Sequence, residues 1–193
     1  MLLGIVASVV IGLVPKPPIV SRTEWGAKPI LPGAIPQSIE RITIHHTGVK
    51  SNTARSLEDK LRGLQVFSQR VDKLANGKTK PAWPDIPYHY YISIDGRIGE
   101  ARDPNFAGDT NTEYNPKGHL LIVVEGEFDV EAPTAAELAS LDALTLWAAE
   151  RWHVPAYRIG MHKDFSHQTA CPGKGLVEYL PRLREVVRLR RSD

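Results

Sequence analysis

The segment Leu120 to Val124 places the strongest limit on how this chain can fold. It consists of five consecutive apolar residues and follows the turn-forming run Asn115-Pro-Lys-Gly. A strand at the edge of a sheet, or one with a solvated face, normally alternates apolar and polar residues, whereas a strand buried on both faces does not. We therefore expect this segment to be a central strand of a covered sheet.

Four further segments have the alternation or the β-branched content of strands. They are Arg41 to Thr47, Tyr88 to Ile94, Arg97 to Arg102 and Tyr157 to Met161. The two middle segments are separated by Asp95-Gly96, which is a strong signal for a β-hairpin. Two of these strands bring histidines to their C-terminal ends, since the first carries His45 and His46 and the last is followed by His162.

Three segments have helical spacing of apolar residues, namely Ser56 to Val71, Ala135 to Trp152 and Leu176 to Arg190. Thr134 begins a capping box, Thr-Ala-Ala-Glu, before the second of them. The stretch from Asp72 to Pro87 contains one glycine and three prolines, which predicts a loop. The order of elements predicts an α/β (α+β) domain with a single mixed central β-sheet flanked by helices.

The first twenty residues form a segment of their own. Residues 2–14 are an almost unbroken apolar run, which is followed by Pro15-Lys-Pro-Pro. The run is shorter than the roughly 20 residues that cross a bilayer and fits the hydrophobic core of a signal peptide. No Lys or Arg precedes it and no clear cleavage site follows, so an uncleaved anchor or a buried N-terminal segment is the alternative. We expect a signal or anchor segment with a Pro-rich linker at 1–20 and one folded domain at 21–193.

Charge and cysteine content narrow the choice of partners. The 193 residues carry a formal net charge of +2, without the concentrated basic stripe that nucleic-acid binding needs, so no nucleic-acid partner is expected. The mild positive charge is compatible with another anionic polymer as a partner. The basic run Arg182 to Arg191 lies at the C-terminal end of a helical pattern, where cations favour the helix dipole. A single cysteine excludes an intramolecular disulfide and leaves Cys171 as a metal ligand or a buried thiol.

His162 and Cys171 lie on either side of a short turn-rich run, and His45 can supply a third ligand from the end of its strand. A structural zinc normally takes four protein ligands, whereas a catalytic zinc takes three and keeps one position open. Two histidines and the only cysteine fit the catalytic arrangement. By itself the spacing of His162 and Cys171 matches no zinc-finger rule. A structural zinc with His167 as the fourth ligand is the alternative.

Several short motifs, taken together and in order, resemble one known family. They are Ser-Arg-Thr-Glu-Trp-Gly-Ala at 21–27, Ile-Thr-Ile-His-His-Thr at 42–47, Asp-Ile-Pro-Tyr-His-Tyr-Tyr-Ile-Ser-Ile-Asp-Gly at 85–96, Tyr-Asn at 114–115, Glu-Gly-Glu-Phe at 125–128, Gly-Met-His-Lys-Asp at 160–164 and Thr-Ala-Cys-Pro-Gly at 169–173. The chain resembles the type 2 N-acetylmuramoyl-L-alanine amidases, a zinc amidase family that includes amidase-type phage lysozymes and peptidoglycan recognition proteins. The resemblance covers nearly the whole chain from Ser21 onward.

The resemblance implies a role for each matching residue. His45, His162 and Cys171 become the zinc ligands, and Tyr88 matches the tyrosine that hydrogen-bonds the developing oxyanion. Thr169 stands where phage members carry a lysine and recognition proteins a threonine, and it either orients water or substrate or only caps its turn. His46, the second histidine of its pair, then has a supporting role.

The implied function is zinc-dependent hydrolysis of the amide between N-acetylmuramic acid and L-alanine in bacterial peptidoglycan. The protein would then be secreted or held in the cell envelope, with residues 2–14 as its only possible membrane attachment. The alternative is a non-catalytic peptidoglycan-binding module on the same fold, as in recognition proteins that have lost the cysteine. The intact ligand set favours the enzyme.

The chain also departs from the family pattern. His162 and Cys171 are nine residues apart, where close relatives commonly have eight. His167 lies in this longer loop, and its alternative roles are a substitute ligand, a proton shuttle or an exposed residue. Residues 72–82 look like an insertion beside the groove, and His119 replaces a small polar residue. These departures bear on substrate preference. Among the four tryptophans, Trp83 is the one expected to contact substrate, and His89 is expected to be structural because side chains alternate along a strand.

Overall fold

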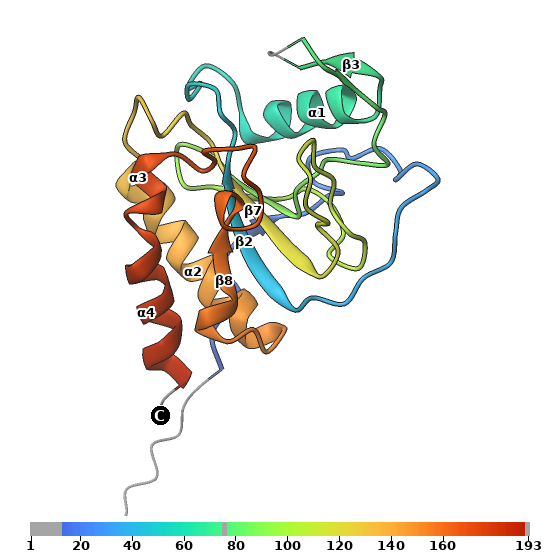
Figure 1. Cartoon of the computed structure of the whole chain (residues 1–193). Helices are drawn as coiled ribbons and strands as arrows, with labels where there is room; N and C mark the ends of the chain where they lie inside the picture. The colour runs from blue at the N-terminus through green and yellow to red at the C-terminus, as the bar shows by residue number, and fades with distance from the viewer. Residues whose placement is uncertain (1–12, 75–76, 192–193) are drawn as a thin grey trace, which may run out of the picture.

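The computed structural model of the chain describes residues 13–74 and 77–191 (Figure 1). The strands are β1 (Ile19–Val20), β2 (Arg41–His46), β3 (Asp72–Lys73), β4 (Thr79–Lys80), β5 (Tyr90–Ile92), β6 (Ile98–Glu100), β7 (His119–Val124) and β8 (Ile159–Met161). The helices are α1 (Leu57–Ser68), α2 (Ala135–Arg151), α3 (Lys174–Val177) and α4 (Leu180–Arg191), with two short 3-10 helices, η1 (Ala156–Arg158) and η2 (His162–Asp164).

Strand β7 lies inside a six-stranded sheet of order β1-β6-β5-β7-β2-β8. It runs parallel to both of its neighbours, β5 and β2, and all six of its residues are buried. The pair β5 and β6 is antiparallel, so the sheet is mixed. The structure therefore confirms the central position predicted from the apolar run and the mixed character of the sheet.

Helices cover both faces of this sheet (Figure 1). On one face, α2 and α4 pack against apolar side chains of β2, β5 and β7 through residues such as Leu144 and Val187. On the other face, Leu57 and Leu61 of α1 pack with Trp25, Tyr91 and Val123. Because successive strand residues point to opposite faces, the even-numbered residues of β2 enter the first core, and His45 lies on the same face as α1.

Two local signals have the structures that the sequence predicts. The side chain of Thr134 accepts a hydrogen bond from the backbone of Glu137, whose side chain accepts one from Thr134, so α2 begins with a capping box. The turn between β5 and β6 contains Gly96 at φ 81°, a conformation that favours glycine. A Cβ at this position would also lie 2.8 Å from the carbonyl oxygen of Ala136.

The boundaries of two helices differ from the prediction. Helix α1 ends at Ser68, three residues before the predicted end at Val71. The predicted C-terminal helix is two helices, because the chain makes a turn at Glu178 and Tyr179 between α3 and α4. Pro181 cannot donate a backbone hydrogen bond, so it fits the first turn of a new helix better than the interior of a continuous one.

Three short strands were not predicted. Strand β1 pairs in parallel with β6 through Ile19 and Ile98, and two residues are too few to show an alternating pattern. The segment from Asp72 to Pro87 was expected to be a loop, but it begins with a hairpin in which β3 pairs with β4. This hairpin is held by the buried side chain of Lys80, and a charged residue in a polar run gives no sequence signal of burial.

Most of the predicted apolar segment at 2–14 lies outside the described residues. Of its last two residues, Leu13 is exposed and the backbone N–H of Val14 donates a hydrogen bond to Glu150 Oε2 at 3.1 Å. Over residues 13–74 and 77–191, none of the helices has the length and apolar character required to span a bilayer.

Candidate metal centre

The two predicted histidine ligands lie side by side because of strand pairing. Ile44 of β2 is in register with Met161 of β8, and His45 and His162 are the residues that follow them. Their ring centroids are 4.5 Å apart, and both side chains are buried. The parallel pairing of two strands that are distant in the sequence thus brings the two imidazoles together.

Cys171 reaches this pair from the loop that follows η2. The loop folds back on itself, since the backbone N–H of Lys163 donates to the carbonyl oxygen of Cys171 at 2.9 Å. Gly173, at φ 83°, lets the chain pack closely, because a Cβ there would lie 2.8 Å from the carbonyl carbon of Phe128. Cys171 Sγ is consequently 3.8 Å from His45 Nδ1.

The donor atoms of His45, His162 and Cys171 all lie within 4.8 Å of one another. In a tetrahedral zinc site the donor atoms are separated by roughly 3.3–3.7 Å, given zinc bonds of about 2.0–2.3 Å. His45 Nε2 is buried and has no hydrogen-bond partner among the described residues, and the Nδ1 atom of the same ring contacts only Cys171 Sγ among the hydrogen bonds of those residues. The donor-atom separations in the structure extend beyond the range of a tetrahedral site, with 4.8 Å as their upper limit, but two nitrogen donors and one sulfur donor are ligand types that zinc takes.

Burial sets the protonation of the three side chains. Desolvation lowers the pKa of His45 well below its ordinary value and that of His162 to about 4, so both imidazoles are neutral at pH 7. Desolvation also raises the pKa of the Cys171 thiol to about 12. A buried thiolate needs a positive partner, which a metal cation provides. The backbone N–H of His46 also points to Sγ, at 3.4 Å.

Thr112 contacts one ring nitrogen of His162. Its hydroxyl is 2.9 Å from His162 Nε2 and 2.8 Å from the hydroxyl of Thr110. A metal-binding histidine typically donates its second ring N–H to such an acceptor, which fixes the ring and its tautomer. This contact leaves Nδ1 of His162 for a ligand. No sequence pattern points to Thr112, since it lies in an irregular loop outside the recognised motifs.

Tyr88 stands next to the histidine pair. Its ring centroid is 5.2 Å from that of His45, and both residues line the same cleft. Desolvation raises the pKa of Tyr88, so the phenol stays protonated and is a hydrogen-bond donor at neutral pH. The position agrees with the predicted convergence of Tyr88 on His45 and His162.

Three other residues singled out in the sequence, Thr169, His167 and His46, lie outside the cluster of donor atoms. The Thr169 hydroxyl accepts a hydrogen bond from the backbone N–H of Cys171 at 3.0 Å, so it supports the turn that carries the thiol. His167 is exposed, and its backbone N–H donates to Glu113 Oε1 at 2.8 Å. His46 is half-buried with its ring 6.2 Å from that of Phe128.

Three residues singled out in the sequence have partners elsewhere in the fold. His89 is buried, accepts the N–H of Leu121 at Nδ1 and is hydrogen-bonded through Nε2 to the carbonyl oxygen of Phe106. His119 is buried and its Nδ1 is 2.8 Å from the Thr43 hydroxyl. Trp83 is only 8% exposed, although it lines the cleft.

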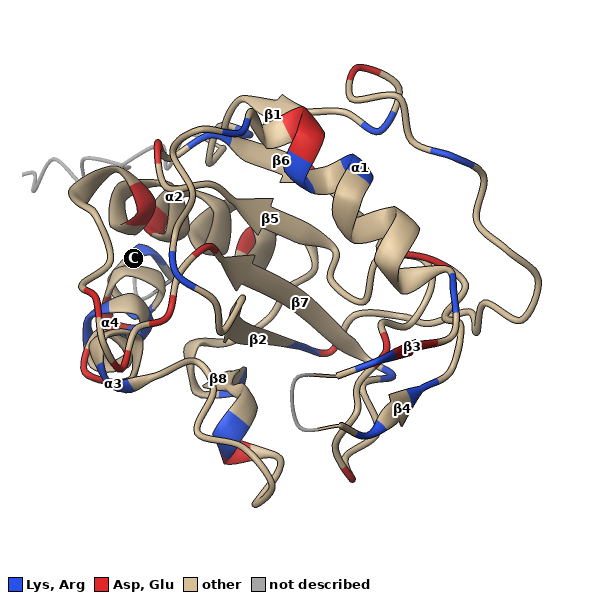
Figure 2. Cartoon of the chain, turned by 90° about the horizontal axis from the view of Figure 1, so that it is seen from above, with Lys and Arg blue, Asp and Glu red and all other residues tan. Residues whose placement is uncertain are grey.

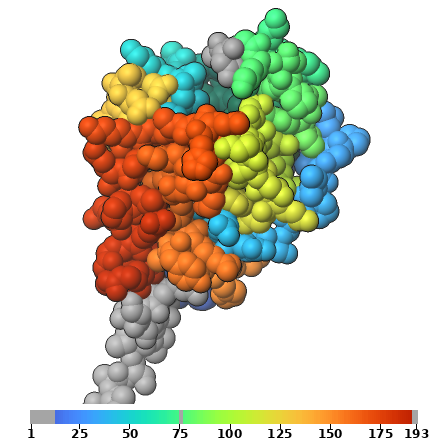
Figure 3. All heavy atoms as spheres, in the orientation of Figure 1, coloured from blue at the N-terminus to red at the C-terminus, as the bar shows by residue number. Residues whose placement is uncertain are grey.

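The cleft beside the cluster has a volume of about 460 Å³. It is lined by His45, Thr47, Gly48, Val49, Leu64, Phe67, Lys73, Leu74, Trp83, Pro87, Tyr88, Asp109, Thr110, Asn111, Thr112 and His162. In the space-filling view the surface is hollowed between the segments coloured green, yellow-green and orange (Figure 3). Two of the three donor residues, His45 and His162, therefore border this cleft.

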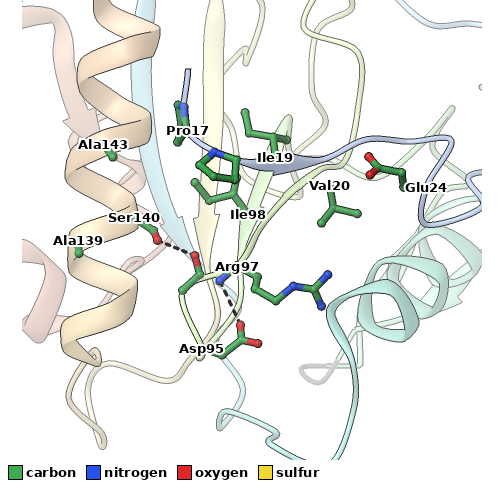
Figure 4. A pocket seen from close by; sticks show the side chains of 12 residues that line it. Pro17, Ile19, Val20, Glu24, Asp95, Arg97, Ile98, Ala139, Ser140 and Ala143 are labelled. Carbon is green, nitrogen blue, oxygen red and sulfur yellow. Dashed lines mark hydrogen bonds between the residues drawn. The ribbon is translucent and has the colours of Figure 1, made fainter. Parts of the chain in front are cut away.

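A second hollow, of about 610 Å³, lies between β1, α2 and the turn from β5 to β6 (Figure 4). Ser140 Oγ donates there to the carbonyl oxygen of Gly96 at 2.5 Å, and the backbone N–H of Arg97 donates to Asp95 Oδ1 at 3.1 Å. No histidine or cysteine is among the described residues that line it. The two histidines of the candidate metal centre line the smaller cleft instead.

The fold is an α/β domain with a mixed sheet that helices cover on both faces. Two imidazoles and a thiol lie together beside a cleft, and these are side chains that commonly bind metals. The model of the N-acetylmuramoyl-L-alanine amidase family matches residues 36–174. The chain belongs to this family, the type 2 amidases and peptidoglycan recognition proteins, as its motifs predicted.

Individual relatives include both recognition proteins and an amidase. The chain is 32% identical over 186 residues to peptidoglycan-recognition protein SD of Drosophila simulans, which covers 91% of this chain and 89% of that protein. The structure resembles that of the endolysin N-acetylmuramoyl-L-alanine amidase LysCS of Clostridium intestinale, with a TM-score of 0.63, 25% identity and coverage of 88% and 96% of the two chains. It also resembles peptidoglycan recognition protein LE in complex with tracheal cytotoxin, a monomeric diaminopimelic acid-type peptidoglycan, with a TM-score of 0.69, 27% identity and coverage of 85% and 92%.

Proposed function

We propose that this protein is a zinc-dependent N-acetylmuramoyl-L-alanine amidase, which hydrolyses the amide bond between N-acetylmuramic acid and L-alanine in bacterial peptidoglycan. One observation carries the proposal. His45, His162 and Cys171 form a complete three-residue donor set at the edge of a cleft that Tyr88 also lines. Three protein ligands leave a coordination position for the reacting groups, as in catalytic zinc sites.

The ligand shell has the supports that a catalytic metal site needs. When bound, zinc would supply polarisation of the amide carbonyl and activation of a water molecule. Thr112 orients the His162 ring. The Thr169 hydroxyl accepts a hydrogen bond from the backbone N–H of Cys171, and the backbone N–H of His46 points to the sulfur of Cys171. These contacts hold the donor atoms in place, so little rearrangement is needed when the substrate binds.

Tyr88 has the properties of the group that stabilises negative charge on the amide oxygen. Its phenol is protonated at neutral pH because burial raises its pKa, and its ring lies beside His45. A donor that is already positioned strengthens its hydrogen bond as charge develops on the oxygen. We therefore assign Tyr88 as a catalytic residue and Thr169 as a residue that positions Cys171, with Zn²⁺ as the cofactor.

A peptidoglycan-binding module without catalysis is the second candidate, because relatives of this chain include recognition proteins. The presence of Cys171 in contact distance of His45 favours the enzyme, since a binding module does not need a thiol next to two neutral imidazoles. Under either function the partner is peptidoglycan. We infer that the protein acts outside the cytoplasmic membrane, in the cell envelope or after secretion.

The variant Cys171→Ser separates these two functions. Serine is similar in size but is a much weaker zinc ligand, so we expect loss of zinc and of amide cleavage with binding to insoluble peptidoglycan largely retained. Cleavage products are identified by mass spectrometry of the released peptides. Full cleavage by the serine variant would contradict the metal assignment, and absence of cleavage by the zinc-loaded wild-type protein would favour the binding module.

A further inference from the structure

The hairpin β3–β4 forms one wall of the cleft that contains the candidate metal centre. Lys73 and Leu74 of this hairpin line the cleft together with His45 and His162. Asp72 pairs with Lys80 and Lys73 pairs with Thr79 across the two strands. Figure 2 shows basic residues on both strands. The hairpin belongs to the segment that looks like an insertion, so this wall is a feature of this chain's own sequence.

A buried lysine fixes the hairpin to the rest of the wall. Lys80 Nζ donates hydrogen bonds to the carbonyl oxygens of Ser68 at 3.0 Å, Arg70 at 2.6 Å and Pro81 at 2.8 Å. These three bonds use all three hydrogens of the ammonium group. The charge also lies 5.0 Å from the ring centroid of Phe67 and 4.6 Å from that of Trp83.

Phe67 and Trp83 both line the cleft, so Lys80 joins its apolar wall to the hairpin that carries Lys73 and Leu74. Separation of the hairpin from the apolar wall would break the three hydrogen bonds of Lys80, so this side chain stabilises their packing. The wall combines aromatic and aliphatic side chains with the exposed side chain of Lys73.

Lys73 is the cation of this wall that has no acidic partner among the described residues. The neighbouring carboxylate, Asp72, pairs with Arg70 at 2.7 Å. Asp109 is the one acidic residue among the described residues that line the cleft, and it pairs with the buried Arg102. The charges that could neutralise Lys73 from within the cleft are already paired, so its ammonium group is available to a bound anion.

We infer that the wall formed by Lys73, Leu74, Phe67 and Trp83 recognises the peptide part of the substrate, with Lys73 pairing with a free carboxylate of that peptide and the other three side chains contacting its aliphatic portions. The inference rests on the proposed amidase function, which places the scissile amide at the metal centre and the peptide along the cleft. A peptidoglycan stem peptide carries ionised carboxylates, and the unpaired lysine is complementary to them. Lys73 is then a residue that determines specificity.

The test compares two soluble muramoyl peptides that differ only in their carboxylates, one with free carboxylates and the other with the same groups amidated. The kcat/KM of each is measured for wild type, Lys73→Gln and Lys78→Gln. We expect wild type to prefer the free carboxylates by about two- to five-fold, as for an exposed ion pair. In Lys73→Gln the ratio of the two kcat/KM values should approach one, through a change in KM. Lys78→Gln removes the same charge from the same hairpin outside the cleft lining and should keep the wild-type ratio.

Two further measurements separate failure of this inference from failure of the proposed function. The preference should decrease when the ionic strength is raised, because an exposed pair is screened by salt. Calorimetric titration of both peptides reports the same discrimination as a ratio of Kd values, even if the protein cleaves neither. If wild type cleaves the peptides and Lys73→Gln has the same ratio of the two kcat/KM values as wild type, the role of Lys73 is overturned and the proposed amidase function is not. Equal Kd values for the two peptides in wild type would overturn the role of Lys73 as well.

Discussion

The hydroxyl of Thr112 lies 2.9 Å from Nε2 of His162, the ring nitrogen that is not needed for a metal bond through Nδ1. This contact ties the loop that carries Thr112 to the end of β8. If His162 binds zinc as proposed, this contact would leave Nδ1 as the coordinating nitrogen. A residue outside every recognised motif would then orient one of the three proposed ligands.

Replacement of Thr112 by valine keeps the size of the side chain and removes the hydroxyl. We expect zinc affinity to fall by about 10- to 100-fold, the usual effect of losing such a supporting contact. Competition with a chromophoric chelator measures this affinity. Thr112→Ser keeps the hydroxyl and should retain most of the affinity, so equal zinc binding by the valine and serine variants would show that the contact does not position His162.

Replacement of Tyr88 by phenylalanine removes the proposed donor to the amide oxygen. We expect kcat to fall by about 10²- to 10³-fold, as for other donors to a developing oxyanion. KM and zinc affinity should change little, since the ring remains beside His45. Steady-state kinetics on a soluble muramoyl peptide separate these quantities. An unchanged kcat would remove Tyr88 from the catalytic residues.

A buried ion pair supports the fold near the end of β7. Lys60 Nζ is 2.7 Å from Glu125 Oε2, and both side chains are almost fully buried. Glu125 also accepts hydrogen bonds from Ser93 and from the backbone of Asn52. Lys60→Met leaves the carboxylate without its cation, and we expect the free energy of unfolding to fall by about 3–5 kcal/mol.

Urea denaturation measures this loss, and the double variant Lys60→Met with Glu125→Gln provides the control, because glutamine removes the charge and keeps an acceptor oxygen for the neighbouring N–H groups. Removal of both charges should recover part of the stability, because no buried charge then remains unpaired. A double variant that is less stable than Lys60→Met would contradict this explanation.

His89 is expected to make stability depend on pH. Burial lowers its pKa in the folded protein from 6.5 to about 3. Between these values the unfolded chain binds a proton at His89 that the folded protein does not, so the free energy of unfolding decreases as the pH falls below about 6.5. The contribution of His89 between pH 7 and pH 4 should be on the order of 1–3 kcal/mol.

The variant His89→Asn isolates this contribution, because the asparagine oxygen can replace Nδ1 as the acceptor for the N–H of Leu121 and does not titrate. We expect the variant to lose less stability than wild type when the pH falls from 7 to 4 in urea denaturation. Parallel pH profiles for the two proteins would show that His89 is not the group responsible.

The parts of the fold that the sequence predicted are those with a local cause. The central position of β7 follows from its unbroken apolar run, and the start of α2 follows from the capping box at Thr134. The adjacency of His45 and His162 depends on the pairing of β2 with β8, which no local pattern encodes. The positions of both histidines at the ends of predicted strands were compatible with this adjacency, and the ordered motifs that resemble a known family led to its prediction.

The features that the sequence did not reveal depend on long-range contacts. Thr112 acts through a hydrogen bond to a distant histidine, and its loop has no periodic pattern. Lys80 is a lysine in a polar segment, for which exposure is the usual expectation, yet three carbonyl oxygens and two aromatic rings surround its ammonium group. The hairpin β3–β4 depends on this buried contact, so it was interpreted as a loop.

The most direct test of the central claim measures new N-terminal L-alanine amino groups released from purified peptidoglycan by the zinc-loaded protein and by the same protein after chelation. The account predicts that these amino groups appear with zinc, disappear with the chelator and return when zinc is restored. Equal release in the chelated protein, or no release under any of the three conditions, would contradict the assignment of His45, His162 and Cys171 as a catalytic zinc site.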